Sequence, residues 1–198
     1  VSSGRTDAFV HDNNQKAHVD ISVNITEEKL KRALNSLIPN DIYVKNAKIV
    51  QDDFHARFMV KGKEYVYILN MGEYDPIKRN YEYQYCKKLD ADKMKEAIKY
   101  MEGTHDFQNL SSNEIKEKST IKTIYSAKIK KEKDKLIFTF CGNGFLRYMV
   151  RVMVGVLIEV GKGKIDVDDI PLIIDGTYNK NYKKVANPEG LYLNNVEY

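Results

Sequence analysis

An acidic residue in a short polar loop, an aromatic hydroxyl and a group of arginines are the side chains of this sequence best suited to chemistry. The loop is Gly4-Arg5-Thr6-Asp7, and the other candidates are Arg57, Tyr65, Arg147 and Arg151. A carboxylate can act as a nucleophile or a general base. Arginine binds carboxylates and phosphates through a planar, bidentate fork. Only six of the 32 basic residues are arginine, so each is a candidate for that geometry.

Spacing alone leaves ordinary structural roles open for these residues. An aspartate in a loop of this composition is most often a turn or cap residue. Tyr65 would serve equally well as a core aromatic, and Arg151 as one half of a structural ion pair. The chemistry therefore depends on which elements bring these side chains together.

Other common catalytic arrangements are absent from the sequence. The four histidines lack the HExxH spacing of a zinc site, and Cys86 and Cys141 are too far apart to form a CxxC pair. There is no GxSxG motif, and Gly142-Asn143-Gly144 lacks the glycine pattern and the lysine of a P-loop. Metal, serine-nucleophile and nucleotide-triphosphate chemistry are not indicated. Two cysteines without a disulfide framework favour a reducing cytoplasm.

The elements that must position these residues are those of an ordinary globular protein, with 42% hydrophobic and 30% charged residues. The longest apolar stretch, residues 145–160, is interrupted by Arg147, Arg151 and Glu159, so it is a poor membrane span. Periodicity predicts helices over residues 27–38, 90–102 and 168–174, a further helix beginning after residue 144, and strands over residues 43–50, 58–70, 123–131, 136–141 and 191–198. This order predicts an α+β fold in which helices pack on a largely antiparallel sheet.

Two of these elements carry candidate residues. The helix after residue 144 has an apolar stripe, and on an ideal wheel Arg147 and Arg151 lie one turn apart on its flank. In the strand over 58–70, Tyr65 shares a face with Tyr67 and Leu69, and the opposite face is also apolar. We therefore expect both faces of this strand to be buried.

The net charge of +4 arises within one segment. Residues 111–135 hold eight lysines against four acidic residues, whereas the rest of the chain balances. The lysines are Lys116, Lys118, Lys122, Lys128, Lys130, Lys131, Lys133 and Lys135. The segment is either a nucleic-acid surface or the solvated edge of a hairpin that resists aggregation.

Six sequence blocks, in a fixed order, carry a resemblance to one known family. They are GRTDAFVH at residues 4–11, DDFHARF at 52–58, KEYVY at 63–67, GTHDF at 103–107, GNGFLRYMVR at 142–151 and ANPEGLYL at 186–193. Together they resemble the motifs of the tRNA pseudouridine synthase A family over essentially the whole chain. The resemblance implies a pseudouridine synthase fold with a mixed, largely antiparallel sheet and helices on one face.

The resemblance also implies the reaction and its catalytic residues. Uridine in tRNA is expected to be isomerised to its carbon-linked form without a cofactor or metal, at a position in the anticodon stem-loop. Asp7 matches the catalytic nucleophile, and Arg151, in the family's Met-Val-Arg position, is expected to pair with it. Tyr65 is expected to stack on the uracil and to assist proton transfer.

The remaining roles concern binding. By the same resemblance, Arg5 is placed to fill the gap that the flipped uridine leaves, and Arg57 and Arg147 contribute to substrate binding. The basic segment would contact RNA phosphates. The implied partners are tRNA and a second copy of the chain, in the cytoplasm.

The sequence departs from the family pattern near the nucleophile. Phe9 stands where glycine is usual, and it would be strained if the position requires a positive φ. Asp12 replaces a small residue. The family's first strand and helix precede this signature, so we interpret residues 1–50 as the remnant of an N-terminal half that carries the aspartate loop, and 51–198 as the catalytic and RNA-binding half. A catalytically impaired RNA-binding relative is the alternative.

Overall fold

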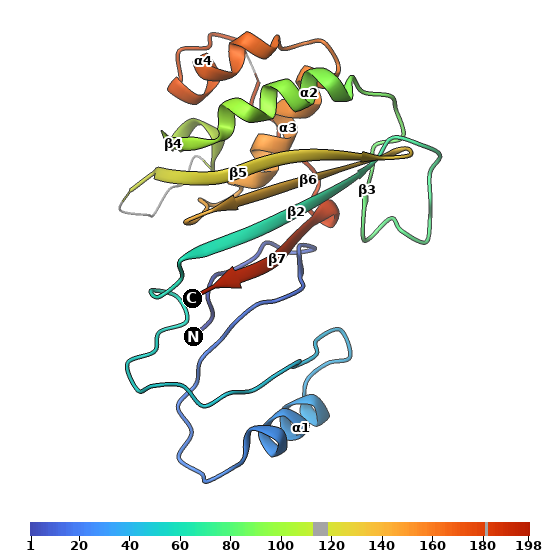
Figure 1. Cartoon of the computed structure of the whole chain (residues 1–198). Coiled ribbons are helices and arrows are strands. Elements are labelled where there is room, and N and C mark those ends of the chain that lie inside the picture. The colour runs from blue at the N-terminus through green and yellow to red at the C-terminus, as the bar shows by residue number, and fades with distance from the viewer. Residues whose placement is uncertain (113–118, 181) are drawn as a thin grey trace.

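The computed structural model describes residues 1–112, 119–180 and 182–198, and it contains one mixed sheet with helices on one face (Figure 1). Within the described residues the sheet has seven strands. Six follow the order β1-β7-β2-β6-β5-β4, and β3 pairs with β2. The strands are β1 (His11–Asp12), β2 (Gly62–Asn70), β3 (Tyr83–Gln84), β4 (Gly103–Asp106), β5 (Ile121–Glu132), β6 (Lys135–Gly142) and β7 (Leu191–Glu197). The α+β prediction is confirmed.

Antiparallel pairing dominates the centre of the sheet. β2 lies between β6 and β7, and β5 and β6 form the predicted hairpin. Lys133, in the hairpin turn, adopts a φ of 53°, a left-handed conformation typical of tight turns. Alternate residues of β6, Leu136, Phe138 and Phe140, are fully buried, whereas those between them are partly exposed. One face of the sheet therefore carries the core.

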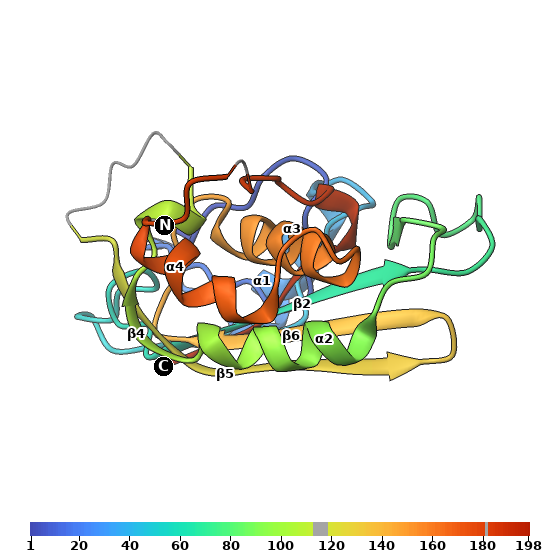
Figure 2. The same cartoon turned by 90° about the horizontal axis from the view of Figure 1, so that it is seen from above.

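The covered face packs against three helices (Figure 2). They are α2 (Ala91–Ala97), α3 (Met149–Gly161) and α4 (Ile170–Asp175), with short 3-10 turns next to α2 and α4. The side chain of Asp90 caps α2, as predicted, by accepting from two backbone N–H groups of its first turn. Every residue of α3 except Arg151 is buried. α3 is thus a core helix that exposes a single charged side chain toward the rest of the molecule.

The predicted start of this helix is wrong. α3 begins at Met149 because Tyr148, its N-cap residue, has a left-handed φ of 63° and interrupts the helical backbone. Arg147 therefore lies in the turn before the helix, not on its flank one turn from Arg151.

The expectation that both faces of β2 are buried also fails. Tyr67 and Leu69 are fully buried against the helices. Val66 and Ile68, on the opposite face of the strand, are only partly buried. Figure 1 shows α2, α3 and α4 together on the other side of the sheet, the side of Tyr67 and Leu69.

The first helix, α1 (Glu27–Leu37), stands apart from the other helices, beyond β7 in Figure 1. Thr26 caps it by accepting from the N–H of Lys29, as expected, yet none of its residues is buried and Leu37 is 83% exposed. Residues 43–50 form no strand, and backbone groups of two of them bond to α1 side chains instead. Val44 bonds with Asn35, and the N–H of Ile49 donates to Glu27. None of the helices in the described part of the chain is long and apolar enough to cross a bilayer.

Candidate active site

The loop that carries Asp7 is anchored on both sides. Before it, the backbone of Ser3 donates to Lys16, and the ammonium of Lys63 on β2 donates to the carbonyl of Ser3 at 2.9 Å. After it, β1 pairs in parallel with β7. Lys63 sits close behind the loop, since a Cβ on Gly4 would lie 2.8 Å from its Nζ. Asp7 is therefore presented from a short loop fixed at both ends.

Asp7 begins a tight turn. The N–H of Val10 donates to the carbonyl of Asp7 at 3.2 Å, and Phe9 has a φ of 65°. A positive φ at the third of four turn residues is the geometry of a type II turn, which favours glycine there. The sequence prediction that Phe9 would be strained if this position required a positive φ is confirmed.

Asp7 and Arg151 form an ion pair. Arg151 Nη1 lies 2.8 Å from Asp7 Oδ2, and the side chains of Arg151 and Asp7 are 13% and 26% exposed. Arg151 Nε also donates to the carbonyl of Ala186 at 2.8 Å, so the guanidinium is held at two points. A charge-assisted bond of this length in a half-buried setting orients the carboxylate. The structure thus brings together the acid and the arginine that the sequence analysis singled out.

Tyr148 links the two arginines of this region despite the later helix start. The guanidinium carbons of Arg147 and Arg151 lie 4.9 and 5.1 Å from the centre of its ring. These distances are within the range of cation–π attraction. Sequence reasoning missed this role of Tyr148, because an ideal helix would have placed its ring elsewhere.

Tyr65 lies on the helix-facing side of β2 and packs edge-on against Phe145, with ring centroids 5.0 Å apart. Burial raises the pKa of its hydroxyl well above the usual range, and the negative charges of Asp12 and Asp7 add to the effect. The hydroxyl therefore keeps its proton at neutral pH. The protonated hydroxyl can donate a hydrogen bond, and it is close enough to Asp7 for that charge to raise its pKa. It is not a phenolate base.

Two further groups surround the aspartate loop. Asp12 accepts from the hydroxyl of Thr6 at 3.0 Å and so closes the loop around Asp7, and burial raises the pKa of Asp12. Burial lowers the pKa of Lys63, and the positive charge of Arg57 lowers it further. Sequence reasoning missed Lys63, although its position two residues before Tyr65 puts both side chains on one face of the strand.

The three arginines predicted to bind RNA are all exposed, but they have different neighbours. Arg5 is exposed, and its side chain makes no hydrogen bond or ion pair within the described residues. Arg57 is also exposed and lies near Lys63, as their electrostatic coupling indicates. Arg147 is exposed over Tyr148. All three side chains are thus exposed.

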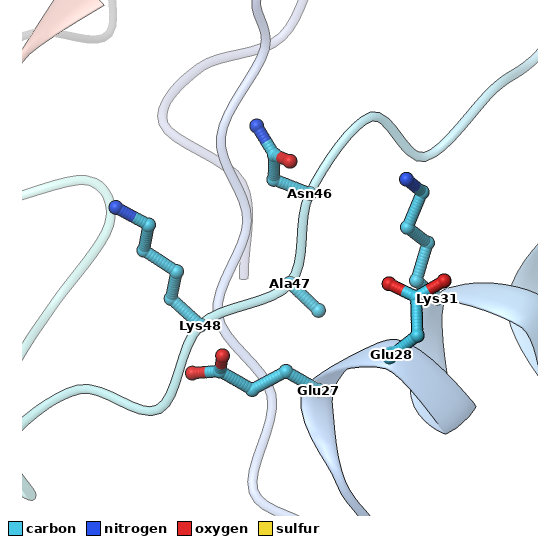
Figure 3. A pocket seen from close by; sticks show the side chains of 6 residues that line it. All are labelled: Glu27, Glu28, Lys31, Asn46, Ala47 and Lys48. Carbon is cyan, nitrogen blue, oxygen red and sulfur yellow. The ribbon is translucent and has the colours of Figure 1, made fainter.

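Two hollows in the molecule lie away from this constellation. One, of about 260 Å³, is bounded by α1 and residues 46–48, and its lining is charged on both sides (Figure 3). The other, of about 330 Å³, is lined by Glu159, Lys164, Ile165, Tyr178, Lys180 and Lys184. Neither includes Asp7, Tyr65 or Arg151. Among the described residues, no group of three or more His, Cys, Asp or Glu is arranged to hold a metal ion.

Comparison with known proteins gives the same assignment over the whole chain. A family model described as tRNA pseudouridine synthase matches residues 97–198. A tRNA pseudouridine synthase A of Limosilactobacillus reuteri (strain DSM 20016) is 40% identical over 201 residues, covering 100% of this chain and 78% of that protein. The corresponding protein of Anoxybacillus flavithermus is 41% identical over 197 residues, and one of Bacillus cereus is 41% identical over 198 residues. Each of these two matches covers 100% of this chain and 80% of the relative. The chain belongs to the tRNA pseudouridine synthase A family.

Proposed function

We propose that Asp7, Arg151 and Tyr65 form the centre with which this chain isomerises uridine to pseudouridine in tRNA. The observation that carries the proposal is the Asp7–Arg151 pair, joined at 2.8 Å across 144 residues of sequence and partly shielded from water. The names of the relatives support tRNA as the substrate. Family resemblance supports the anticodon stem-loop as its location.

The reaction breaks the bond between the ribose and uracil N1 and forms one between the same ribose carbon and uracil C5. C5 then loses its proton, and N1 takes one up, so that the product is an isomer of uridine. A carboxylate oriented by a guanidinium supplies the nucleophile or base that this exchange requires. Tyr65, protonated and beside the carboxylate, supplies a ring for stacking on the uracil and a hydroxyl for proton transfer. No step uses a cofactor.

Access to the uridine requires that it leaves the base stack, which costs a few kcal/mol. Arg5 is exposed and extends from the same loop as Asp7, so it is placed to occupy the vacated position. Arg57 and Arg147 flank the site and contribute contacts to the RNA. In this proposal residues 1–50 supply the nucleophile loop, and residues 51–198 supply its partners and most of the RNA surface.

Two wider assignments accompany the activity. The free thiols of Cys86 and Cys141 support a reducing cytoplasm. The exposed apolar side chains of residues 19–59 support a homodimer, because monomeric proteins rarely leave large apolar patches open to water. These exposed side chains include Val19, Val23, Leu37, Ile42, Tyr43, Ile49 and Phe58.

Replacement of the nucleophile tests the activity. We expect Asp7→Asn to lower pseudouridine formation on unmodified tRNA by at least about a hundredfold. The Kd for tRNA should stay within a few-fold, because phosphate contacts supply most of the affinity. Chemical mapping of the product also locates the modified uridine.

Asp20→Asn, at an exposed position of the same N-terminal region, is the control and should retain full turnover. Near wild-type turnover of Asp7→Asn would refute the catalytic assignment. If the wild-type chain binds tRNA but forms no pseudouridine, the chain is instead an RNA-binding relative, the alternative to which the strained Phe9 turn points.

A further inference from the structure

A backbone crossing on α3 lies one helical turn from Arg151. A Cβ built on Gly155 would lie 1.9 Å from the carbonyl oxygen of Lys184, 2.8 Å from its carbonyl carbon and 3.5 Å from the nitrogen of Ala186. Residues 184–186 therefore pass directly over the helix at Gly155. The obstructing atoms are backbone, so no side chain fits without moving the segment.

The same face of α3 contacts residues 184–186 on both sides of the crossing. One turn before Gly155, Arg151 makes two bonds with Ala186. Its carbonyl accepts from the Ala186 N–H at 3.0 Å, and its Nε donates to the Ala186 carbonyl at 2.8 Å. One turn after Gly155, the carboxylate of Glu159 lies 3.6 Å from the ammonium of Lys184. Residues four apart share a face, so the three contacts form one row.

We propose that Gly155 is a positioning residue that sets the orientation of the Arg151 guanidinium toward Asp7. The guanidinium is fixed by Asp7 on one side and by the carbonyl of Ala186 on the other. The carbonyl stays within reach only because the segment crosses the helix at backbone contact. Gly155 is buried in α3 and, in this proposal, acts through Arg151. The inference rests on the proposed function of the pair.

Asn187, the next residue of the segment, is bonded to the sheet. The buried hydroxyl of Tyr67 on β2 donates to the carbonyl of Asn187 at 2.8 Å. Segment 184–187 is thus held between α3 and β2, and either attachment can be loosened separately. This gives two independent variants that disturb the carbonyl of Ala186 without touching Arg151.

Gly155→Ala is the first test. The added methyl requires the segment to move by roughly 1 Å or more to restore ordinary contact distances. That shift carries the Ala186 carbonyl out of hydrogen-bond range of Arg151. We expect kcat for pseudouridine formation to fall about tenfold to hundredfold, with the Kd for tRNA within about twofold of wild type. Single-turnover kinetics and a binding titration on the same tRNA measure the two quantities.

Gly161→Ala is the matched control. Gly161 is also buried on α3, but a Cβ there would meet the flexible sulfur of Met94 at 2.6 Å, away from segment 184–186. It should retain wild-type kcat. A kcat for Gly155→Ala within twofold of wild type would overturn the inference. If Gly155→Ala does not fold, Tyr67→Phe decides, because it removes only a hydroxyl. An unchanged kcat in Tyr67→Phe then overturns the inference.

A double-mutant cycle with Arg151→Lys tests whether the loss of kcat in Gly155→Ala passes through Arg151. Lysine lacks the Nε–H that bonds to Ala186, so Gly155→Ala should cost little further activity in that background. Independent, multiplying losses would mean that Gly155 does not act through Arg151. If Arg151→Lys has no measurable turnover, the comparison of kcat with Kd decides alone. Full turnover of Asp7→Asn would refute the proposed function instead, and an inactive Asp7→Asn beside a fully active Gly155→Ala would refute only this inference.

Discussion

Phe9 carries a conformational cost two residues after Asp7. Its φ of 65° is a left-handed conformation, which costs a non-glycine residue about 1–2 kcal/mol. Its side chain is 79% exposed and therefore recovers little of that cost through packing. The turn that presents Asp7 is thus held in place by its neighbours, including the Thr6–Asp12 bond, and not by the preference of Phe9 itself.

Glycine at this position should stabilise the chain. Phe9→Gly relieves the left-handed strain, while the greater freedom of glycine in the unfolded chain offsets about 0.5–1 kcal/mol of the gain. We expect a net increase of about 0.5–1 kcal/mol in the free energy of unfolding. Thermal or urea denaturation measures it.

Phe9→Ala is the control for loss of the aromatic ring. Alanine keeps the unfavourable φ, so its free energy of unfolding should not rise. A destabilised Phe9→Gly would mean that the ring, although exposed, makes a contribution larger than the backbone strain.

At the residue level, family motifs predicted the pairing of Asp7 with Arg151, but not what supports it. Ala186 contributes through its carbonyl and Gly155 through the absence of a side chain, and neither leaves a chemical signature in the sequence. The ammonium of Lys63 bonds to the backbone of Ser3, a contact between distant segments that spacing does not indicate. Positions that act through backbone become visible only once the segments are assembled.

The β5–β6 hairpin divides the lysines of the basic segment along its length. Lys122 lies near the start of β5, far from the hairpin turn. It is beside the loop before α3, since a Cβ on Gly144 would be 3.9 Å from its Cδ. Lys130 pairs with Glu132 at 2.5 Å, and Lys135 pairs with the buried Glu82 at 2.5 Å. At about 3.3 Å per residue, the turn lies roughly 30 Å or more from Lys122. Lys116 and Lys118 lie outside the described residues.

This division predicts which lysine binds the substrate near the site. Lys122→Gln should weaken tRNA binding and reduce the salt dependence of log K by about 0.7 to 0.9 per lost phosphate contact. Lys130→Gln, already paired with Glu132, should change the slope much less. Titrations over a series of salt concentrations measure both slopes.

Neither substitution should alter the free energy of unfolding by more than about 0.5 kcal/mol. If the slope is unchanged in Lys122→Gln and reduced in Lys130→Gln, the RNA lies along the hairpin tip instead. Unchanged slopes in both would identify the basic segment as a solubilising edge.

Among the elements, those with a strong period and a capping residue were predicted well, and those that depend on a neighbour were not. α1, α2, the hairpin and β7 lie close to their predicted positions. The predicted strand over 43–50 finds no adjacent strand among the described residues and does not form. The apolar stripe of α3 continues back to Leu146, so the pattern did not reveal the break that Tyr148 introduces.

At the scale of the whole molecule, the exposed apolar side chains of residues 19–59 predict an oligomer that one added charge can disrupt. Leu37 is 83% exposed at the end of α1, and Leu37→Glu should shift the chain from dimer to monomer. Ile77→Glu is the control, because Ile77 is equally exposed, at 84%, on the loop between β2 and β3. Sedimentation velocity at micromolar concentrations distinguishes the species. A monomeric wild-type chain would contradict the homodimer.

The pairing of β1 with β7 also bears on when the Asp7–Arg151 pair can form. Asp7 and Arg151 are separated by 144 residues. β1 pairs with β7, which is the last of the described strands along the sequence. Contacts between such distant segments form late, because the long loop must close before they gain any stability. During synthesis the Asp7 loop therefore emerges before β7 and lacks the β1–β7 pairing until that strand has left the ribosome. The Asp7–Arg151 pair therefore gains the support of the β1–β7 pairing only after β7 has joined the sheet.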